Sequence, residues 1–276
     1  MASLNTSELQ FAFTFFAKFN ALNNYNFNRV IVPSTVLEGR DNYDYNGTDL
    51  VLDDFFFQFK MTSLLTRAYA AQANQLSTPY FRFDVKNEPT RASVSGMGQL
   101  DFLINHANRP GANNKVYYVT PSFDTTVYSN NNLGNFWIHH FYQSAPNNID
   151  DFCAFIDIKS IDPIWVNNDN NHVICYEHGS SNAYFFSEPK SVKKVKGFIS
   201  TLYPEKLSVD SLQTIDSRIN EIIQSFSELK VPDFKSEDNK VISIQKFLIE
   251  ELNLFWLPLI TKRQDRTDNR INQILA

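Results

Sequence analysis

Apolar side chains recur at helical spacing close to the start of the chain. The pattern runs from Ser7 to about Leu22, and its stripe contains Glu8, Ala12, Phe15, Phe16 and Phe19. Intervals of three and four residues between such positions are typical of an amphipathic helix. Asn5, three residues before Glu8, resembles the start of a capping box, so we expect the helix to begin there.

Short runs rich in apolar, β-branched and aromatic residues follow, which are typical of β-strands, and the run at 80–85 alternates between apolar and polar positions. We expect strands in seven runs: 29–32, 50–52, 55–60, 80–85, 116–120, 152–158 and 172–176, with an eighth at 183–186. Helical spacing or composition predicts helices over residues 63–73 and 99–107. Helices and strands that alternate in this way favour an α/β fold, in which a mixed central sheet is flanked by helices.

The character of the chain changes after residue 190. Apolar residues then recur at intervals of three and four, at Leu212, Ile215, Ile219, Ile222, Phe226 and Leu229. A second helix is expected from about Val241, and Pro258 would kink or end it. We therefore predict an α/β domain over residues 1–190 and a C-terminal helical appendage over residues 191–276.

One segment, residues 47–60, combines strands with groups capable of chemistry. Asp53 and Asp54 between two apolar runs predict a two-residue hairpin turn. In that register Asp49 lies opposite Gln58, and strand alternation puts Lys60 on the same face. A carboxylate and an amide oxygen are ligands suited to Mg²⁺, and a neighbouring lysine can orient water and offset phosphate charge.

These residues resemble the core motif of the PD-(D/E)XK nuclease superfamily, which has an Asp on one strand and an acidic-or-Gln, any, Lys triplet on the next. The resemblance covers roughly residues 5–86 and implies a restriction-endonuclease-like fold, metal-dependent hydrolysis of phosphodiester bonds, and Mg²⁺ or Mn²⁺ as cofactor. It assigns Asp49, Gln58 and Lys60 to catalysis, with Asp49 and Gln58 on the metal. Gln58 stands where Glu is commoner, which lowers the charge of the ligand set. The string from Pro33 to Lys60 is also similar to uncharacterised bacterial proteins.

Two acids are candidates for a further ligand. Glu38 precedes the expected hairpin by one loop, so we place it among the catalytic and metal-binding residues; a solvated loop acid is the alternative. Glu8 is explained by capping, although the N-terminal helix of the superfamily often contributes an acid. The whole set has an ordinary structural interpretation too, in which Lys60 snorkels at a strand end, Asp49 pairs with it and Gln58 satisfies a neighbouring polar group.

Four basic residues are candidates for binding nucleic acid: Arg82, Lys193, Lys194 and Lys196. Arg82 lies on the polar face of its expected strand beside Asp84, so a surface ion pair is the alternative. The lysines, together with Lys190, form a cluster whose alternative reading is a solvated helix start. His172, Cys175 and His178 are not expected to bind zinc, because Cys175 would face away from both histidines on a strand.

Composition changes this picture in two respects. The net charge is −5, and residues 1–189 carry 11 Lys and Arg against 18 Asp and Glu, so a broad basic surface for nucleic acid is absent. The two cysteines cannot form a disulfide scaffold, and no signal peptide or apolar stretch long enough to span a membrane is evident. We therefore expect a cytoplasmic protein.

The function expected from these observations is a metal-dependent nuclease, with DNA the favoured substrate and restriction or anti-phage defence the implied setting. The alternatives are a catalytically silent binding or scaffold protein with the same fold, and an effector subunit that a partner activates. The apolar C-terminal positions Ile271, Ile274 and Leu275 have no evident target within the chain. We expect self-association or a protein partner through residues 205–276.

Overall fold

The computed structural model describes fourteen elements of the chain. Its described residues are 8, 11, 12, 15, 16, 50–67, 72, 75–89, 91–110, 114–122, 149, 153–163, 171–186, 190–195, 213–231 and 240–261. In chain order the elements are β1 (Leu50–Phe59), β2 (Ser63–Leu65), β3 (Tyr80–Lys86), α2 (Gln99–Ala107), β4 (Lys115–Pro121), β5 (Cys153–Asp157), the 3₁₀ turn η2 (Ile158–Ser160), β6 (Asn171–Tyr176), β7 (Asn182–Phe185), β8 (Lys190–Val195), β9 (Gln213–Thr214), α6 (Ile215–Ser225), α7 (Lys240–Leu252) and β10 (Leu254–Thr261).

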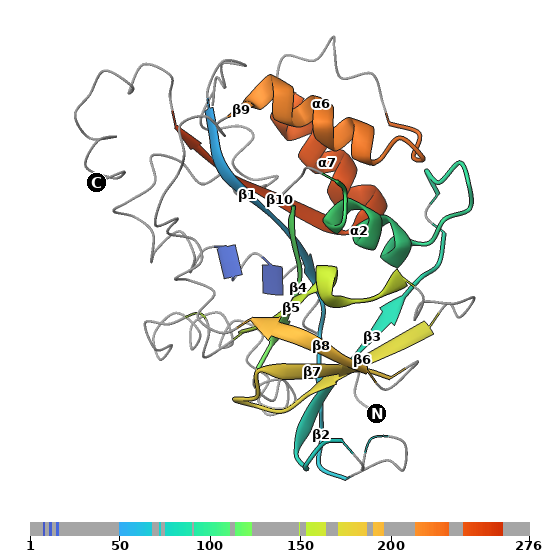
Figure 1. Ribbon diagram of the computed structural model, residues 1–276, viewed down its shortest axis with the longest axis vertical. Helices are drawn as coiled ribbons and strands as arrows, with labels where there is room; N and C mark the ends of the chain where they lie inside the picture. The colour runs from blue at the N-terminus through green and yellow to red at the C-terminus, as the bar shows by residue number, and fades with distance from the viewer. Residues whose placement is uncertain are drawn as a thin grey trace, which may run out of the picture.

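The strands form one large mixed sheet in the order β10-β1-β4-β5-β8-β7-β6-β3-β2, and β9 pairs with the start of β1. β1 runs parallel to β4 and antiparallel to β10, while the other neighbours are antiparallel. Helices α2, α6 and α7 gather on one side of β1 and β10 (Figure 1). The predicted α/β class with a mixed sheet and flanking helices is confirmed.

The two faces of β1 pack against different layers. Phe55, Phe57 and Phe59 are buried in one cluster with Phe11, Phe15 and Phe16, which are helical residues of the N-terminal segment. Phe56 lies in the other cluster, which contains the buried side chains of α2, α6 and α7. Strand alternation therefore directs Asp54, Phe56 and Gln58 toward the three helices. The expected separation of the odd-numbered phenylalanines from Gln58 is confirmed.

The strands predicted at 80–85, 116–120, 152–158, 172–176 and 183–186 are confirmed as β3 to β7, and the helix at 99–107 is α2. The helix predicted over 63–73 is wrong at its start, because residues 63–65 form β2 and pair with β3. Long-range pairing there prevails over the helical preference of the Leu- and Ala-rich sequence. The strand predicted at 29–32 lies outside the described residues.

The predicted helical appendage over 191–276 is wrong, because this part of the chain supplies strands to the sheet. β8 lies between β5 and β7, and β10 pairs along almost the whole of β1. Ile215, Ile219 and Ile222 of α6 are buried in the same cluster as Phe56 of β1. The apolar seam that predicted a helix is thus covered within the chain. Pro258 does not kink a helix but lies in β10 opposite Asp54.

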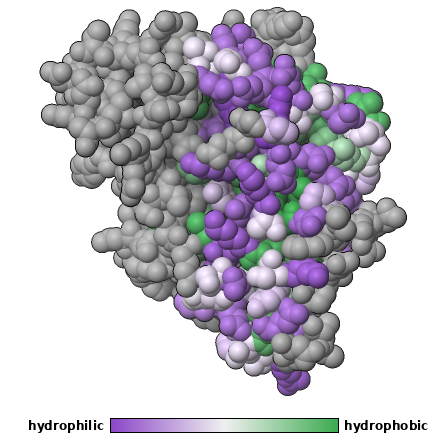
Figure 2. Space-filling view, viewed as in Figure 1, coloured by the Kyte–Doolittle hydropathy of each residue, from purple (hydrophilic) through white to green (hydrophobic). Residues whose placement is uncertain are grey.

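The described face that Figure 2 shows is predominantly hydrophilic. Figure 2 shows polar residues over most of the visible described face, with hydrophobic residues in small patches. Among the described residues the one large hydrophobic side chain that is exposed is Val94. None of the described helices has the length and apolar character needed to cross a bilayer.

Candidate functional site

The predicted hairpin at Asp53 and Asp54 is wrong, because β1 is one continuous strand through both residues. Asp53 pairs with Leu259 and Asp54 with Pro258, so both aspartates pair with β10 instead of forming a turn. A rise of about 3.3 Å per residue separates Leu50 from Lys60 by roughly 30 Å. The register that brought Asp49 beside Gln58 and Lys60 is therefore lost. Asp49 and Glu38 themselves lie outside the described residues.

Lys60 lies directly after β1, where its backbone N–H donates to the carbonyl of Val119 at 3.0 Å and extends the pairing with β4. Its side chain is 12% exposed, and Nζ forms an ion pair with Oε1 of Glu8 at 3.8 Å. Burial lowers the pKa of Lys60, and the Glu8 carboxylate partly offsets that effect. At 3.8 Å the pair is longer than a hydrogen bond, so the ammonium N–H donors stay available to a water or a phosphate oxygen.

Glu8 reaches Lys60 because the N-terminal helical residues pack on the sheet. The rings of Phe11 and Phe59 lie edge to face at 5.6 Å, and those of Phe15 and Phe57 have the same spacing and a similar tilt. Oε2 of Glu8 accepts a hydrogen bond from the Asn253 side-chain amide at 2.8 Å. The alternative role of Glu8 as a capping residue involves Asn5, which lies outside the described residues.

Gln58 is buried with 1% exposure, and its Nε2 donates to the carbonyl of Leu252 at 2.8 Å. The side-chain amide of Gln99 donates to the same carbonyl. Because a carbonyl only accepts hydrogen bonds, the orientation of the Gln58 amide is fixed and its Oε1 points away from Leu252. Two glutamines thus satisfy a carbonyl that the end of α7 leaves unpaired.

The described oxygen ligands are too few for a magnesium site. The carboxylate that contacts Lys60 among the described residues is that of Glu8, whereas Mg²⁺ prefers six oxygen ligands, several of which are waters. In the part of the chain that the structure describes, no three His, Cys, Asp or Glu residues are grouped so that they could hold a metal ion. His172 and Cys175 belong to different layers, since His172 stacks on Phe185 whereas Cys175 packs with Leu76 and Tyr80.

The basic candidates are dispersed. Arg82 pairs with Asp84 at 3.2 Å, as in the surface-pair reading. Lys193 and Lys194 lie in β8, so the reading as a helix start is wrong. Lys194 is buried, donates to the carbonyl of Glu177 and lies over the Tyr176 ring, whereas Lys193 is exposed. Lys196 lies outside the described residues.

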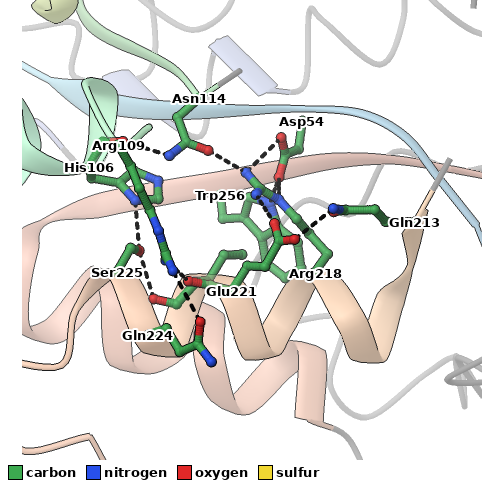
Figure 3. A network of polar contacts seen from close by, with 11 residues as sticks. Asp54, His106, Arg109, Asn114, Gln213, Arg218, Glu221, Gln224, Ser225 and Trp256 are labelled. Carbon is green, nitrogen blue, oxygen red and sulfur yellow. Dashed lines mark hydrogen bonds and ion pairs between the residues drawn. The ribbon is translucent and has the colours of Figure 1, made fainter. Parts of the chain in front are cut away.

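A second polar cluster, around Asp54 and Arg218, was not predicted from the sequence (Figure 3). Arg218 of α6 binds the Asp54 carboxylate through Nε at 2.6 Å and through an NH2 group at 3.1 Å, and the Trp256 indole donates to the same carboxylate at 3.0 Å. Arg218 also donates to Asn114 and Glu221. The sequence does carry a sign of this cluster, because Arg218 falls on the apolar stripe of its helix, three residues after Ile215.

His106 lies at the edge of this cluster, between the rings of Phe56 and Phe226. The Ser225 hydroxyl donates to the Ile222 carbonyl, so it accepts from Nδ1 of His106 at 2.8 Å, which places the proton on Nδ1. Nε2 is buried without a partner among the described residues. Burial and, to a smaller extent, the charges of Arg218 and Arg109 together lower the pKa of His106 to about 3, so the ring is neutral near pH 7.

The two polar centres therefore differ in what they can do. The Asp54 carboxylate receives three donors inside the protein and holds β1, α6 and β10 together, which is a structural role. Lys60, by contrast, is partly exposed and carries donors that the described residues do not use. Comparison of the sequence with protein-family models and with curated proteins, and of the structure with solved structures, gives no match.

Proposed function

We propose that this protein hydrolyses phosphodiester bonds of nucleic acid, with DNA as the favoured substrate. The reacting centre is Lys60 at the carboxyl end of β1, with Glu8 and Gln58 beside it. The resemblance to PD-(D/E)XK nucleases, a restriction-endonuclease-like fold and a role in restriction or anti-phage defence are part of the same proposal.

The observation that carries the proposal is the contact between Glu8 and Lys60. The resemblance implies an N-terminal helix that packs on the sheet and often contributes an acid, and Glu8 is an acid on such a segment, 3.8 Å from the motif lysine. A lysine that is 12% exposed loses hydration, which is a cost unless the ammonium has a partner or a function. Among the described residues Glu8 is the ion-pair partner of Lys60. Their separation of 3.8 Å leaves the ammonium N–H groups able to bind a water or a phosphate oxygen.

In the proposed reaction Lys60 donates hydrogen bonds to a non-bridging phosphate oxygen and to the attacking water. The water oxygen attacks phosphorus, and its proton moves to the Glu8 carboxylate. The bond from phosphorus to the departing nucleoside oxygen breaks, and that oxygen takes a proton from solvent. The products are one phosphomonoester end and one hydroxyl end, so no oxidant or reductant is needed.

Mg²⁺ or Mn²⁺ is proposed from the resemblance, as an electrophile that stabilises phosphate charge. Glu38 and Gln58 remain proposed ligands, of which Glu38 lies outside the described residues. Asp49 precedes Leu50 at the opposite end of the continuous β1, so it is not proposed as a ligand of a metal beside Lys60. The dependence of the cleavage rate on Mg²⁺ or Mn²⁺ is therefore measured together with the effect of each substitution.

The test is a cleavage assay on double-stranded DNA, single-stranded DNA and RNA, with Mg²⁺, Mn²⁺ or EDTA. Lys60→Met keeps the length of the buried stem and removes the charge, and Glu8→Gln removes the carboxylate; each is expected to lower the rate by at least about 100-fold. Lys246→Ala, an exposed lysine on α7, is the matched control and should cleave like the wild type. Cleavage that survives both Lys60→Met and Glu8→Gln would contradict the assignment.

A non-catalytic binding or scaffold protein is the second candidate. The observation that favours it is the single carboxylate beside Lys60, together with the acidic balance of residues 1–189. It predicts binding of nucleic acid or protein with no cleavage under any metal condition. The partner-activated effector makes the same prediction for the isolated chain and differs once a partner that binds residues 205–276 is added.

A further inference from the structure

The turn that ends α7 meets the proposed centre at two points. The Leu252 carbonyl accepts the amides of Gln58 and Gln99, and the side chain of the next residue, Asn253, donates to Glu8 Oε2 at 2.8 Å. The other oxygen of the same carboxylate, Oε1, faces Lys60 Nζ at 3.8 Å. One carboxylate is therefore held by an amide on one side and by an ammonium on the other.

The backbone of Asn253 is fixed independently of that contact. Its N–H donates to the Ile249 carbonyl at 2.9 Å, which closes the last turn of α7, and its φ is +48°. Residues in this left-handed conformation at a helix C-terminus are usually Gly and sometimes Asn. Asn therefore has an ordinary explanation as a helix stop. Gly would serve that purpose at least as well and would lack the donor, so the amide calls for a separate explanation.

The surroundings of Glu8 make such a donor useful. Its side chain is 37% exposed, so in the absence of a second contact the carboxylate could rotate away from Lys60 into solvent. Coulomb attraction at 3.8 Å does not fix direction, whereas a hydrogen bond from an amide to a carboxylate is directional and is strengthened by the charge.

We propose that Asn253 is a positioning residue, which aims the Glu8 carboxylate at Lys60 through its side-chain amide. The chemical consequence rests on the proposed function, because an aimed carboxylate matters only if Glu8 takes a proton in the reaction. The contact itself does not depend on catalysis and can be measured separately.

The first experiment measures cleavage by the full chain with Asn253→Gly, Glu8→Gln and both substitutions together. Glycine suits the left-handed backbone and so offsets part of the stability lost with the hydrogen bond; Asn253→Gly should therefore stay folded under the assay conditions while its cleavage rate falls at least about tenfold. The double variant should be no slower than Glu8→Gln alone, because both changes disable the same group. Asn108→Gly, at the C-terminus of α2, is the control and should cleave like the wild type. Wild-type cleavage by Asn253→Gly, or losses that multiply, would overturn the proposal.

A second experiment separates this inference from the proposed function. A double-mutant cycle of Asn253→Gly with Glu8→Ala, which removes the acceptor that Glu8→Gln would keep, should give a coupling of at least about fivefold in the unfolding equilibrium constant in urea. In the swapped pair, Glu8→Gln with Asn253→Asp, the amide at position 8 can donate to the carboxylate at position 253. This variant should therefore regain the stability that the hydrogen bond supplies. It should still cleave slowly, because position 8 no longer carries a carboxylate. Coupling in a wild type that cleaves nothing would mean that the nuclease proposal fails and that Asn253 nevertheless holds Glu8. Coupling below about twofold, or wild-type cleavage by the swapped pair, would overturn the role of Asn253.

Discussion

At the scale of single residues, the number of donors around each charge separates structure from candidate chemistry. The buried carboxylate of Asp54 accepts two bonds from Arg218 and one from Trp256, and removing one partner from such a buried pair typically costs 3–5 kcal/mol. Lys60 has one described ion-pair partner, 3.8 Å away, and is reached by solvent. A buried charged group whose hydrogen bonds are all made within the protein contributes to stability. A partly exposed charged group with unused hydrogen-bond donors is a place where a ligand can bind.

His106 provides a prediction on pH at this scale. Its pKa is about 3 in the folded protein and ordinarily about 6.5, so between these values the unfolded chain binds more protons and stability falls as the pH falls. From pH 6 to pH 4.5 this one group should lower the free energy of unfolding by about 2 kcal/mol. Urea unfolding at several pH values measures the change, and His106→Asn should remove that part of the slope.

The control for this measurement is His178→Asn, because His178 is exposed. Its pH dependence should match that of the wild type. A His106→Asn variant that keeps the wild-type slope would mean that the ring is accessible to protons in the folded state, in contradiction to its packing between Phe56 and Phe226.

At the scale of elements, the sequence predicted local conformation better than pairing. The alternation in β1 correctly separated Phe55, Phe57 and Phe59 from Gln58, since a period of two holds for any strand partner. The turn at Asp53 and Asp54 was wrong, because β1 continues through both residues and the buried Asp54 carboxylate is satisfied by Arg218. Asp54 has Arg218, 164 residues away, as its partner, and no local pattern indicates such a pair. Asn253 and Gln99 were missed for the same reason.

The continuity of β1 leads to a prediction that bears on Asp49. Spin labels on Asp49→Cys and Lys60→Cys should lie roughly 35 Å apart, since eleven residues of strand rise about 3.3 Å each. In the hairpin register the two labels would lie within about 15 Å of one another. Pulsed electron paramagnetic resonance measures this distance, and the native Cys153 and Cys175 are buried, which limits unwanted labelling. A short distance would restore Asp49 to the vicinity of Lys60.

At the scale of the whole molecule, the sheet needs both ends of the chain. The N-terminal phenylalanines cover one face of β1, and the other face is covered by α2, α6 and α7, of which the last two come from beyond residue 212. The sequence predicted α6 and α7 from their apolar stripes but assigned both helices to an appendage. An apolar stripe indicates that one face of a helix is buried, but it does not identify the surface that covers this face. The stripes therefore could not predict that the helices pack on the sheet.

The last prediction follows from this arrangement. A chain that ends at residue 190 would lack β10, the antiparallel neighbour of β1, and would uncover Phe56 beneath α6 and α7. Exposure of that much apolar surface is unfavourable, so residues 1–190 should not fold alone, and the full chain should unfold in one cooperative transition. Circular dichroism and tryptophan fluorescence during urea unfolding of the chain with Trp137→Phe and Trp165→Phe test this: coincident curves are expected, and the remaining Trp256, buried in β10, reports on the C-terminal part. Two separate transitions, or a folded fragment 1–190, would instead support an independent C-terminal unit, and the sheet order β10-β1-β4 would then be wrong.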